Sequence, residues 1–127
     1  MSQKHSRMVN GGRAVWLTER LWKLSAGLEI FSISIDKVKE FEQNCWFGPG
    51  DEPTCRAVAE HARQIADSDL SCPIILSSDG RLMDGGHRLA KAWLMGLKEV
   101  NAVKFKSDPD PDYVEPIENE KDIKTYA

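Results

Sequence analysis

The first third of the chain alternates between two apolar patterns, one with the period of a helix and one with the period of a strand. Apolar residues recur at helical spacing across 14–26, and Gly27 follows, which predicts a short amphipathic helix ending near that glycine. Residues 31–35 read FSISI, and this strict alternation predicts a strand with one buried face. Asp36 can cap a further helical segment directly after that strand.

A loop and a second helix are expected next. Residues 46–53 read WFGPGDEP, and two glycines and two prolines in eight positions cannot continue a helix. Thr54 then caps a helix whose apolar stripe consists of Val58, Ala62 and Ile65. This helix is expected to pack that stripe on the core.

The remaining apolar segments predict a hairpin, a helix and one more strand. The apolar run 73–76 is followed by the turn residues SSDG, after which 81–83 return as a partner strand. Good helix formers occupy 87–95 and stop at Gly96. Alternation resumes over 100–105. The pattern predicts a single α+β domain in which a small mixed sheet packs with helices. Four side chains are expected in its core: Met83, Leu89, Trp93 and Leu94.

Composition distinguishes the two ends from the middle. With 127 residues, of which 41% are hydrophobic, the chain has enough apolar side chains for one core. Residues 1–12 are polar and end in two glycines, so they are expected to be a mobile lead-in. Residues 106–127 hold three of the six prolines and 3 basic against 7 acidic side chains. This acidic tail is expected to be extended or disordered, which leaves 13–105 as the folded domain.

Charge and cysteine content exclude several classes of protein. The net charge is −3, and outside the acidic tail 14 basic residues stand against 13 acidic ones, so direct DNA binding is not expected. No run approaches the roughly 18–20 apolar residues of a membrane span, and no signal peptide is recognisable. Cys45, Cys55 and Cys72 are odd in number and lack zinc-site spacing. A cytoplasmic location is therefore expected.

The segment Asp84-Gly85-Gly86-His87-Arg88 carries the chemistry most clearly. It lies between a predicted strand and the N-terminus of a predicted helix, where unpaired N–H groups and the helix dipole favour an anion. Two glycines let a ligand approach the backbone, and His87 and Arg88 add side-chain donors. The sequence predicts a phosphate site at this turn. In the alternative interpretation, the turn uses Asp and Gly purely for geometry, with Asp84 as the helix cap and Arg88 as a solvated charge.

A second basic feature lies on the helix that follows Thr54. Arg56 and Arg63 are seven residues apart and share one helix face, so they could complete a polyphosphate site with the glycine turn. Alternatively this face is solvated and Glu60 pairs with one of the arginines. His61 has no obvious partner and is expected at the surface.

Taken together, the order of these elements and motifs resembles the ParB N-terminal (ParB-like) and sulfiredoxin superfamily over residues 30–105. The resemblance depends on four stretches of sequence: SIDKV at 34–38, CPIIL at 72–76, DGR at 79–81, and DGGHRLAKA at 84–92 followed by Gly96.

The resemblance implies a compact α+β fold that binds nucleotide phosphates. Its phosphate-binding turn corresponds here to Gly85, Gly86, His87 and Arg88, and its basic helix to Arg56 and Arg63. The implied ligand is a nucleoside tri- or diphosphate, ATP or CTP, with Mg²⁺ as the expected metal. Gly86 stands where sulfiredoxins have their reactive cysteine, so their repair reaction is not expected. The free-standing ParB-like and serine-kinase-like members are closer in motif.

Three functions fit this resemblance. The first is a nucleotide-dependent phosphotransferase or hydrolase, the second a non-catalytic nucleotide-responsive module with a protein partner, and the third a ParB-like nuclease. The near-neutral body speaks against the nuclease. Phosphoryl transfer needs a group that orients the nucleophile, and Asp84 is the nearest carboxylate. Other candidates depend on how the 46–53 loop folds: Glu40, Glu42, Asp51 and Glu52.

Overall fold

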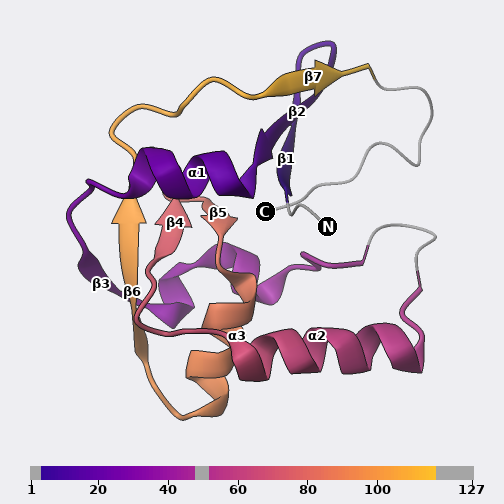
Figure 1. The fold of residues 1–127 in the computed structure, drawn as a ribbon, viewed down its shortest axis with the longest axis vertical. Coiled ribbons are helices and arrows are strands. Elements are labelled where there is room, and N and C mark those ends of the chain that lie inside the picture. The colour runs from indigo at the N-terminus through magenta and orange to yellow at the C-terminus, as the bar shows by residue number, and fades with distance from the viewer. Residues whose placement is uncertain (1–3, 48–51, 117–127) are drawn as a thin grey trace.

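The computed structural model of the chain describes residues 4–47 and 52–116. Within these ranges the chain forms helices, one mixed sheet and one antiparallel sheet (Figure 1). One sheet has the order β3-β6-β4-β5, and its strands are β3 (Phe31–Ser34), β6 (Glu99–Lys104), β4 (Ile74–Leu76) and β5 (Leu82–Asp84). The other has the order β1-β2-β7, formed by β1 (Lys4–Val9), β2 (Gly12–Leu17) and β7 (Tyr113–Glu115). The helices are α1 (Thr18–Ser25), α2 (Cys55–Asp67) and α3 (Gly86–Leu94), with 3₁₀ turns η1 (Ile35–Lys37) and η2 (Lys39–Glu42).

The four-stranded sheet is mixed, which confirms the predicted α+β class. β4 and β5 form the expected antiparallel hairpin, and α3 then carries the chain back so that β6 pairs with β4 in parallel. β3 adds to the other side of β6 in antiparallel orientation. The hairpin and α3 therefore lie next to each other in sequence and in space, and the turn between them lies at the edge of the sheet.

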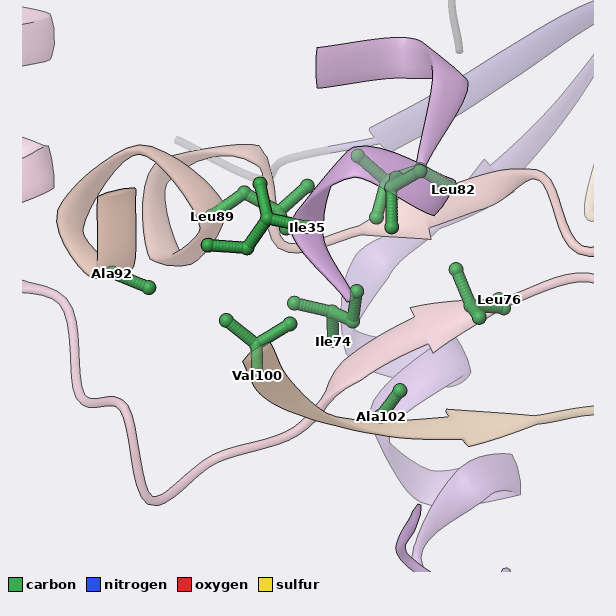
Figure 2. Packing of buried hydrophobic residues seen from close by; sticks show 9 residues of the cluster. Ile35, Ile74, Leu76, Leu82, Leu89, Ala92, Val100 and Ala102 are labelled. Atoms are coloured by element: carbon green, nitrogen blue, oxygen red, sulfur yellow. The ribbon is translucent and has the colours of Figure 1, made fainter. Parts of the chain in front are cut away.

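Alternate side chains of this sheet enter two hydrophobic clusters, one on each face. Ile74 and Leu76 point to the face that packs against η1 and α3, whereas Ile75 between them points to the face covered by β2 and α1. Figure 2 shows the first cluster, in which Leu89 of α3 and Ile35 of η1 meet over the sheet. The core is thus a three-layer arrangement with the sheet in the middle.

The N-terminal segment differs from the expected mobile lead-in and helix. Residues 4–9 form β1, which pairs with β2 in register from Lys4 opposite Leu17 to Val9 opposite Gly12. Residues 14–17 belong to β2 rather than to a helix, and α1 begins only at Thr18. The helical spacing was misleading because Ala14, Val15 and Trp16 are all buried, so β2 has no polar face that would reveal its period of two.

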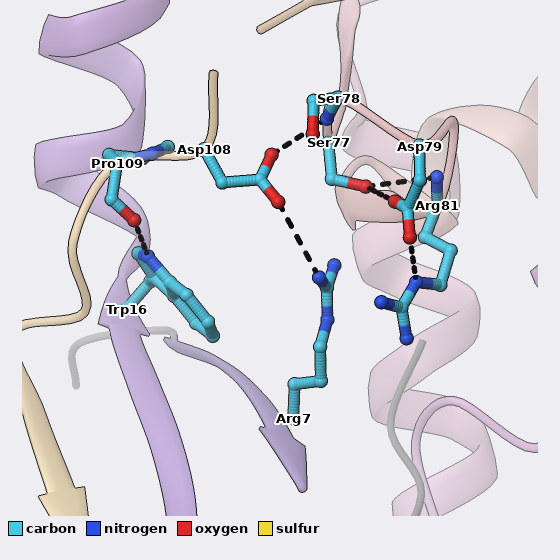
Figure 3. A network of polar contacts seen from close by, with 8 residues as sticks. All are labelled: Arg7, Trp16, Ser77, Ser78, Asp79, Arg81, Asp108 and Pro109. Carbon is cyan, nitrogen blue, oxygen red and sulfur yellow. Dashed lines mark hydrogen bonds and ion pairs between the residues drawn. The ribbon is translucent and has the colours of Figure 1, made fainter. Parts of the chain in front are cut away.

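The segment 106–116 is extended, one of the two states expected for the tail. It lies along β2, where β7 pairs with residues 13–15 and the Trp16 Nε1–H donates to the Pro109 carbonyl at 2.8 Å. Asp108 connects it to the β4–β5 turn and to β1, accepting from the Ser78 N–H at 2.7 Å and pairing with Arg7 at 3.8 Å (Figure 3). Residues 117–127 lie outside the described part of the chain.

The predicted cap of α2 is confirmed, but its predicted apolar stripe is wrong. Thr54 Oγ1 accepts from the Ala57 N–H at 3.1 Å. Val58 is 52% exposed and Ala62 is also exposed, whereas Ile65 is half-buried together with Ala57 and His61. The face of α2 that packs on the rest of the molecule is therefore the row 57–61–65. This row contains a histidine, so the contact between α2 and α3 is partly polar.

Two of the four expected core residues are buried and two are not. Met83 and Leu89 lie in the core, at 3% and 0% exposure. Trp93 and Leu94 are 60% and 67% exposed, because the last turn of α3 leaves the core side to Leu89 and Ala92. Asp36 is the second residue of the 3₁₀ turn η1, which begins at Ile35, so the predicted cap at Asp36 is wrong. No helix in 4–47 or 52–116 is long and apolar enough to cross a membrane.

Candidate functional site

The turn from β5 into α3 has the predicted position and backbone. β5 ends at Asp84, α3 begins at Gly86, and Gly85 between them is the N-cap residue with φ +122°. No side chain of the described residues caps α3. The N-cap residue is a glycine and offers no side-chain acceptor to the first N–H groups of α3, and the Trp46 indole lies next to Gly86.

The two glycines of the turn differ in how closely the protein packs around them. A Cβ on Gly85 would lie 2.5 Å from Cγ2 of Ile74, so only glycine fits against β4 there. A Cβ on Gly86 would lie 3.4 Å from Nε1 of Trp46, an ordinary contact. The sequence interpretation explained these glycines by the approach of a ligand, whereas the structure explains Gly85 by its backbone angle and by Ile74.

Asp84 connects three elements around the turn. Its Oδ2 atom accepts from Arg88 NH2 at 2.6 Å and from Trp22 Nε1 on α1 at 2.8 Å. The side chains of Asp84 and Arg88 are only 13% and 15% exposed. Two parts of the alternative interpretation are therefore wrong, because Asp84 does not cap α3 and Arg88 is not a solvated charge. Its third part, the use of glycine for geometry, is confirmed for Gly85. Arg88 Nε is buried and has no hydrogen-bond partner among the residues described.

His87 belongs to a stack of rings that the sequence did not reveal. Its Nε2 atom lies 2.8 Å from Nδ1 of His61 on α2, so the two imidazoles share a hydrogen bond. The indole of Trp46 stacks on both rings, with centroids 4.6 Å from His87 and 4.8 Å from His61. Phe47 meets His61 edge-on at 5.1 Å. This cluster covers the His87 side of the turn with residues of the loop after η2.

The ring stack keeps His87 neutral near pH 7. Burial lowers the pKa of His87 to about 4, and the neighbouring His61 and Arg88 act in the same direction, while Asp84 opposes them. In the shared hydrogen bond one of the facing nitrogens carries the proton and the other accepts it.

The structure brings His61, rather than Arg56 or Arg63, to the turn. Both arginines are exposed on α2. At 100° per residue they lie about 140–160° around the helix from His61, on the side away from α3. The histidine was missed because it was considered alone. Its spacing of four residues from Ala57 and from Ile65 was the available signal for an inward-facing row.

The carboxylates considered as catalytic bases have different surroundings. Asp84 is held by Arg88 and Trp22, as described above. Glu40 is buried, and its Oε1 accepts from the Leu82 N–H at 2.9 Å, a bond that joins η2 to β5. Glu42 and Glu52 are exposed, and Asp51 lies outside the described residues. Across 4–47 and 52–116 there is no group of three or more His, Cys, Asp or Glu arranged to hold a metal ion.

Comparison with known proteins identifies no relative. The chain matches no protein-family model, no curated protein and no solved structure. The likeness to the ParB N-terminal and sulfiredoxin superfamily therefore depends on the sequence motifs alone.

Proposed function

We propose that the turn from Asp84 to Arg88 binds the phosphate groups of a nucleotide. The observation that supports this most is a surplus of donors at one place. The first turn of α3 has no side-chain cap, and Arg88 Nε beside it is buried without an acceptor among the described residues. Buried donors are rarely left unpaired, and a phosphate offers several acceptor oxygens.

The pairing of Arg88 with Asp84 determines how such a phosphate would be held. Arg88 NH2 is already bonded to the Asp84 carboxylate. The phosphate would therefore accept mainly from the backbone N–H groups, and in addition from the guanidinium donors that Asp84 does not use. Asp84 at the same time keeps the guanidinium in a fixed orientation. A phosphate next to His87 would raise the pKa of that ring from its low value, because a nearby negative charge favours the cationic form.

The proposed ligand is a nucleoside triphosphate or diphosphate, ATP or CTP, as the motif resemblance implies. Mg²⁺ would enter with the phosphates, since this ion is commonly held by substrate oxygens together with one or two carboxylates. Release of phosphate, or a phosphorylated small molecule, would indicate a hydrolase or phosphotransferase. Binding without turnover would indicate a regulatory module that acts on a protein partner.

Thermal-shift measurements with ATP, CTP, ADP and GTP in the presence of Mg²⁺ test the proposal. A ligand that binds only the folded state raises its melting temperature. We expect a shift with at least one nucleotide, and a clear loss of it in Arg88→Lys, which keeps the charge but loses the planar fork. Arg81→Lys is the matched control, because Arg81 also pairs with a carboxylate, Asp79, at 2.8 Å but lies in the β4–β5 turn.

Two results would overturn the proposal. One is that none of the four nucleotides, each at millimolar concentration, raises the melting temperature. The other is an equal shift in Arg88→Lys and Arg81→Lys, since that would place the binding site elsewhere. Each variant is compared with its own ligand-free melting temperature, so that a change in stability is not mistaken for a change in binding.

A further inference from the structure

Trp22 of α1 combines exposure with a fixed orientation. The residue is 53% exposed, while its neighbour Leu21 is fully buried in the core and anchors the helix. An exposed tryptophan side chain usually changes rotamer easily. Here the indole Nε1–H donates to Asp84 Oδ2 at 2.8 Å, which holds one edge of the ring against the end of β5. More than half of the residue's surface thus stays open to solvent in a defined position.

The residue that holds this indole belongs to the glycine turn itself. Asp84 Oδ2 accepts from both Trp22 and Arg88, so indole, carboxylate and guanidinium form one connected group. Arg88 is in the first turn of α3, where the proposed phosphate binds. The exposed ring is therefore adjacent to the phosphate site, because only the Asp84 carboxylate lies between the indole and Arg88.

The other two tryptophans outside the core lack this combination. Trp46 is half-buried, and its ring already stacks on His61 and His87. Trp93 is 60% exposed but lies in the last turn of α3, roughly 10 Å along the helix axis from its first residue. Only Trp22 among the described tryptophans is exposed, held by a hydrogen bond and adjacent to the turn.

We propose that the indole of Trp22 stacks on the base of the nucleotide whose phosphates bind at the glycine turn. This inference rests on the proposed function and adds the site for the aromatic base. Every nucleobase presents a flat π-face, and stacking on an aromatic side chain is worth about a ten-fold gain in affinity without choosing among bases. The site therefore selects nucleotides over phosphate compounds that have no aromatic ring.

Two substitutions of Trp22 separate stacking from support of Asp84. Trp22→Phe keeps an aromatic ring and loses the N–H donor, whereas Trp22→Leu loses both. Each is titrated by isothermal calorimetry with the tightest-binding nucleotide and with tripolyphosphate, which has no base. We expect Trp22→Leu to lose about ten-fold in nucleotide affinity, and Trp22→Phe to lose much less. Tripolyphosphate should bind wild type and both variants with similar affinity, and Trp93→Leu should leave both ligands unaffected.

The possible failures are distinguishable. Equal nucleotide affinity in Trp22→Phe and Trp22→Leu would overturn the stacking site. So would a parallel loss of nucleotide and tripolyphosphate affinity, which would assign to Trp22 only a role in orienting Asp84. In both cases binding by wild type would leave the phosphate site standing. If wild type bound neither ligand, the phosphate site and the stacking site would both be refuted.

Discussion

His61 Nδ1 lies 2.8 Å from His87 Nε2, so a hydrogen bond between two imidazoles joins α2 to the first turn of α3. This bond requires one donor nitrogen and one acceptor nitrogen. The indole of Trp46 covers both rings. The α2–α3 contact therefore includes the His87 ring, and protonation of His87 would bring a charge into this stack of rings.

Acid should destabilise the protein through His87. Its pKa is about 4 in the folded state, against an ordinary value of 6.5, so below pH 6.5 the unfolded chain takes up a proton that the folded chain does not. The stabilising effect is complete above 6.5 and disappears as the pH falls toward 4. Per pH unit this amounts to at most about 1.4 kcal/mol, and less because the ring is partly solvated.

Urea denaturation at pH 4 to 7 of wild type and His87→Gln measures this effect. We expect the free energy of unfolding of His87→Gln to fall less steeply over this window, because its side chain does not titrate. Carboxylates that titrate in the same range contribute equally to both proteins. Parallel pH curves for the two would contradict the assignment to His87.

Gly85→Ala should destabilise the fold more than any other glycine substitution in a turn with positive φ. The new Cβ would lie 2.5 Å from Ile74 Cγ2, and the backbone has φ +122°. We expect a loss of about 2–4 kcal/mol in the free energy of unfolding. Gly80→Ala is the control, with φ +84° and nothing within 4 Å of the added atom. Gly80→Ala reports backbone strain alone, which costs about 1 kcal/mol in the free energy of unfolding. An equal loss in the two variants would show that Ile74 moves to accommodate the new Cβ at position 85.

Hydrogen exchange should show α2 opening before the rest of the molecule. None of its side chains is fully buried, and at its C-terminal end Lys91 Nζ donates to the carbonyls of Ala66 at 2.9 Å and Ser68 at 2.6 Å. We expect faster exchange of α2 amides than of those in β4 and β6. Lys91→Met removes both bonds and should accelerate α2 exchange at least about five-fold, the equivalent of one of the two. Lys23→Met, at an exposed lysine of α1, should leave the α2 rates unchanged.

Trp16 and Trp93 should differ strongly in their effect on stability. Trp16 is 5% exposed, lies in the cluster between β2 and the sheet, and donates to Pro109. Trp16→Ala should cost about 3–5 kcal/mol in the free energy of unfolding, measured by urea denaturation. Trp93→Ala should cost less than about 1 kcal/mol, since Trp93 is 60% exposed. A large loss in Trp93→Ala would mean that its contact with Phe41, at 6.4 Å between ring centroids, matters more than its exposure indicates.

Local signals in the sequence predicted the centre of the molecule. The β4–β5 hairpin, the glycine turn and α3 are consecutive, and each is specified by residues close to it, such as Gly80 and Gly96 with positive φ. The same holds for Thr54 at the start of α2. Turn and cap chemistry acts over a few residues, so it can be read from the chain directly.

Contacts between distant segments could not be predicted in this way. β2 was predicted as part of a helix because Ala14, Val15 and Trp16 are all buried, and one of its two partner strands, β7, lies about a hundred residues later. Its other partner, β1, is joined to it by the local turn at Asn10 and Gly11, a hairpin signal that the sequence analysis missed. His61 and Trp46 reach the turn from other elements, and nothing near them in the sequence indicates His87 as a partner. The predicted donors His87 and Arg88 are at the turn, but their bonds to His61 and Asp84 depend on the tertiary arrangement. The sequence thus indicated which residues form the turn and missed what surrounds it.

The pairing of β2 with β7 has a consequence for biosynthesis. A ribosome that has delivered the first hundred residues has released both strands of the N-terminal hairpin, but not the segment that hydrogen-bonds to the free edge of β2 and to the Trp16 indole. This edge of β2 stays unpaired until residues 109–115 have emerged from the ribosome. This end of the molecule is therefore completed only after residues 109–115 have been synthesised, and a nascent chain stalled before Pro109 would be open to edge-to-edge association.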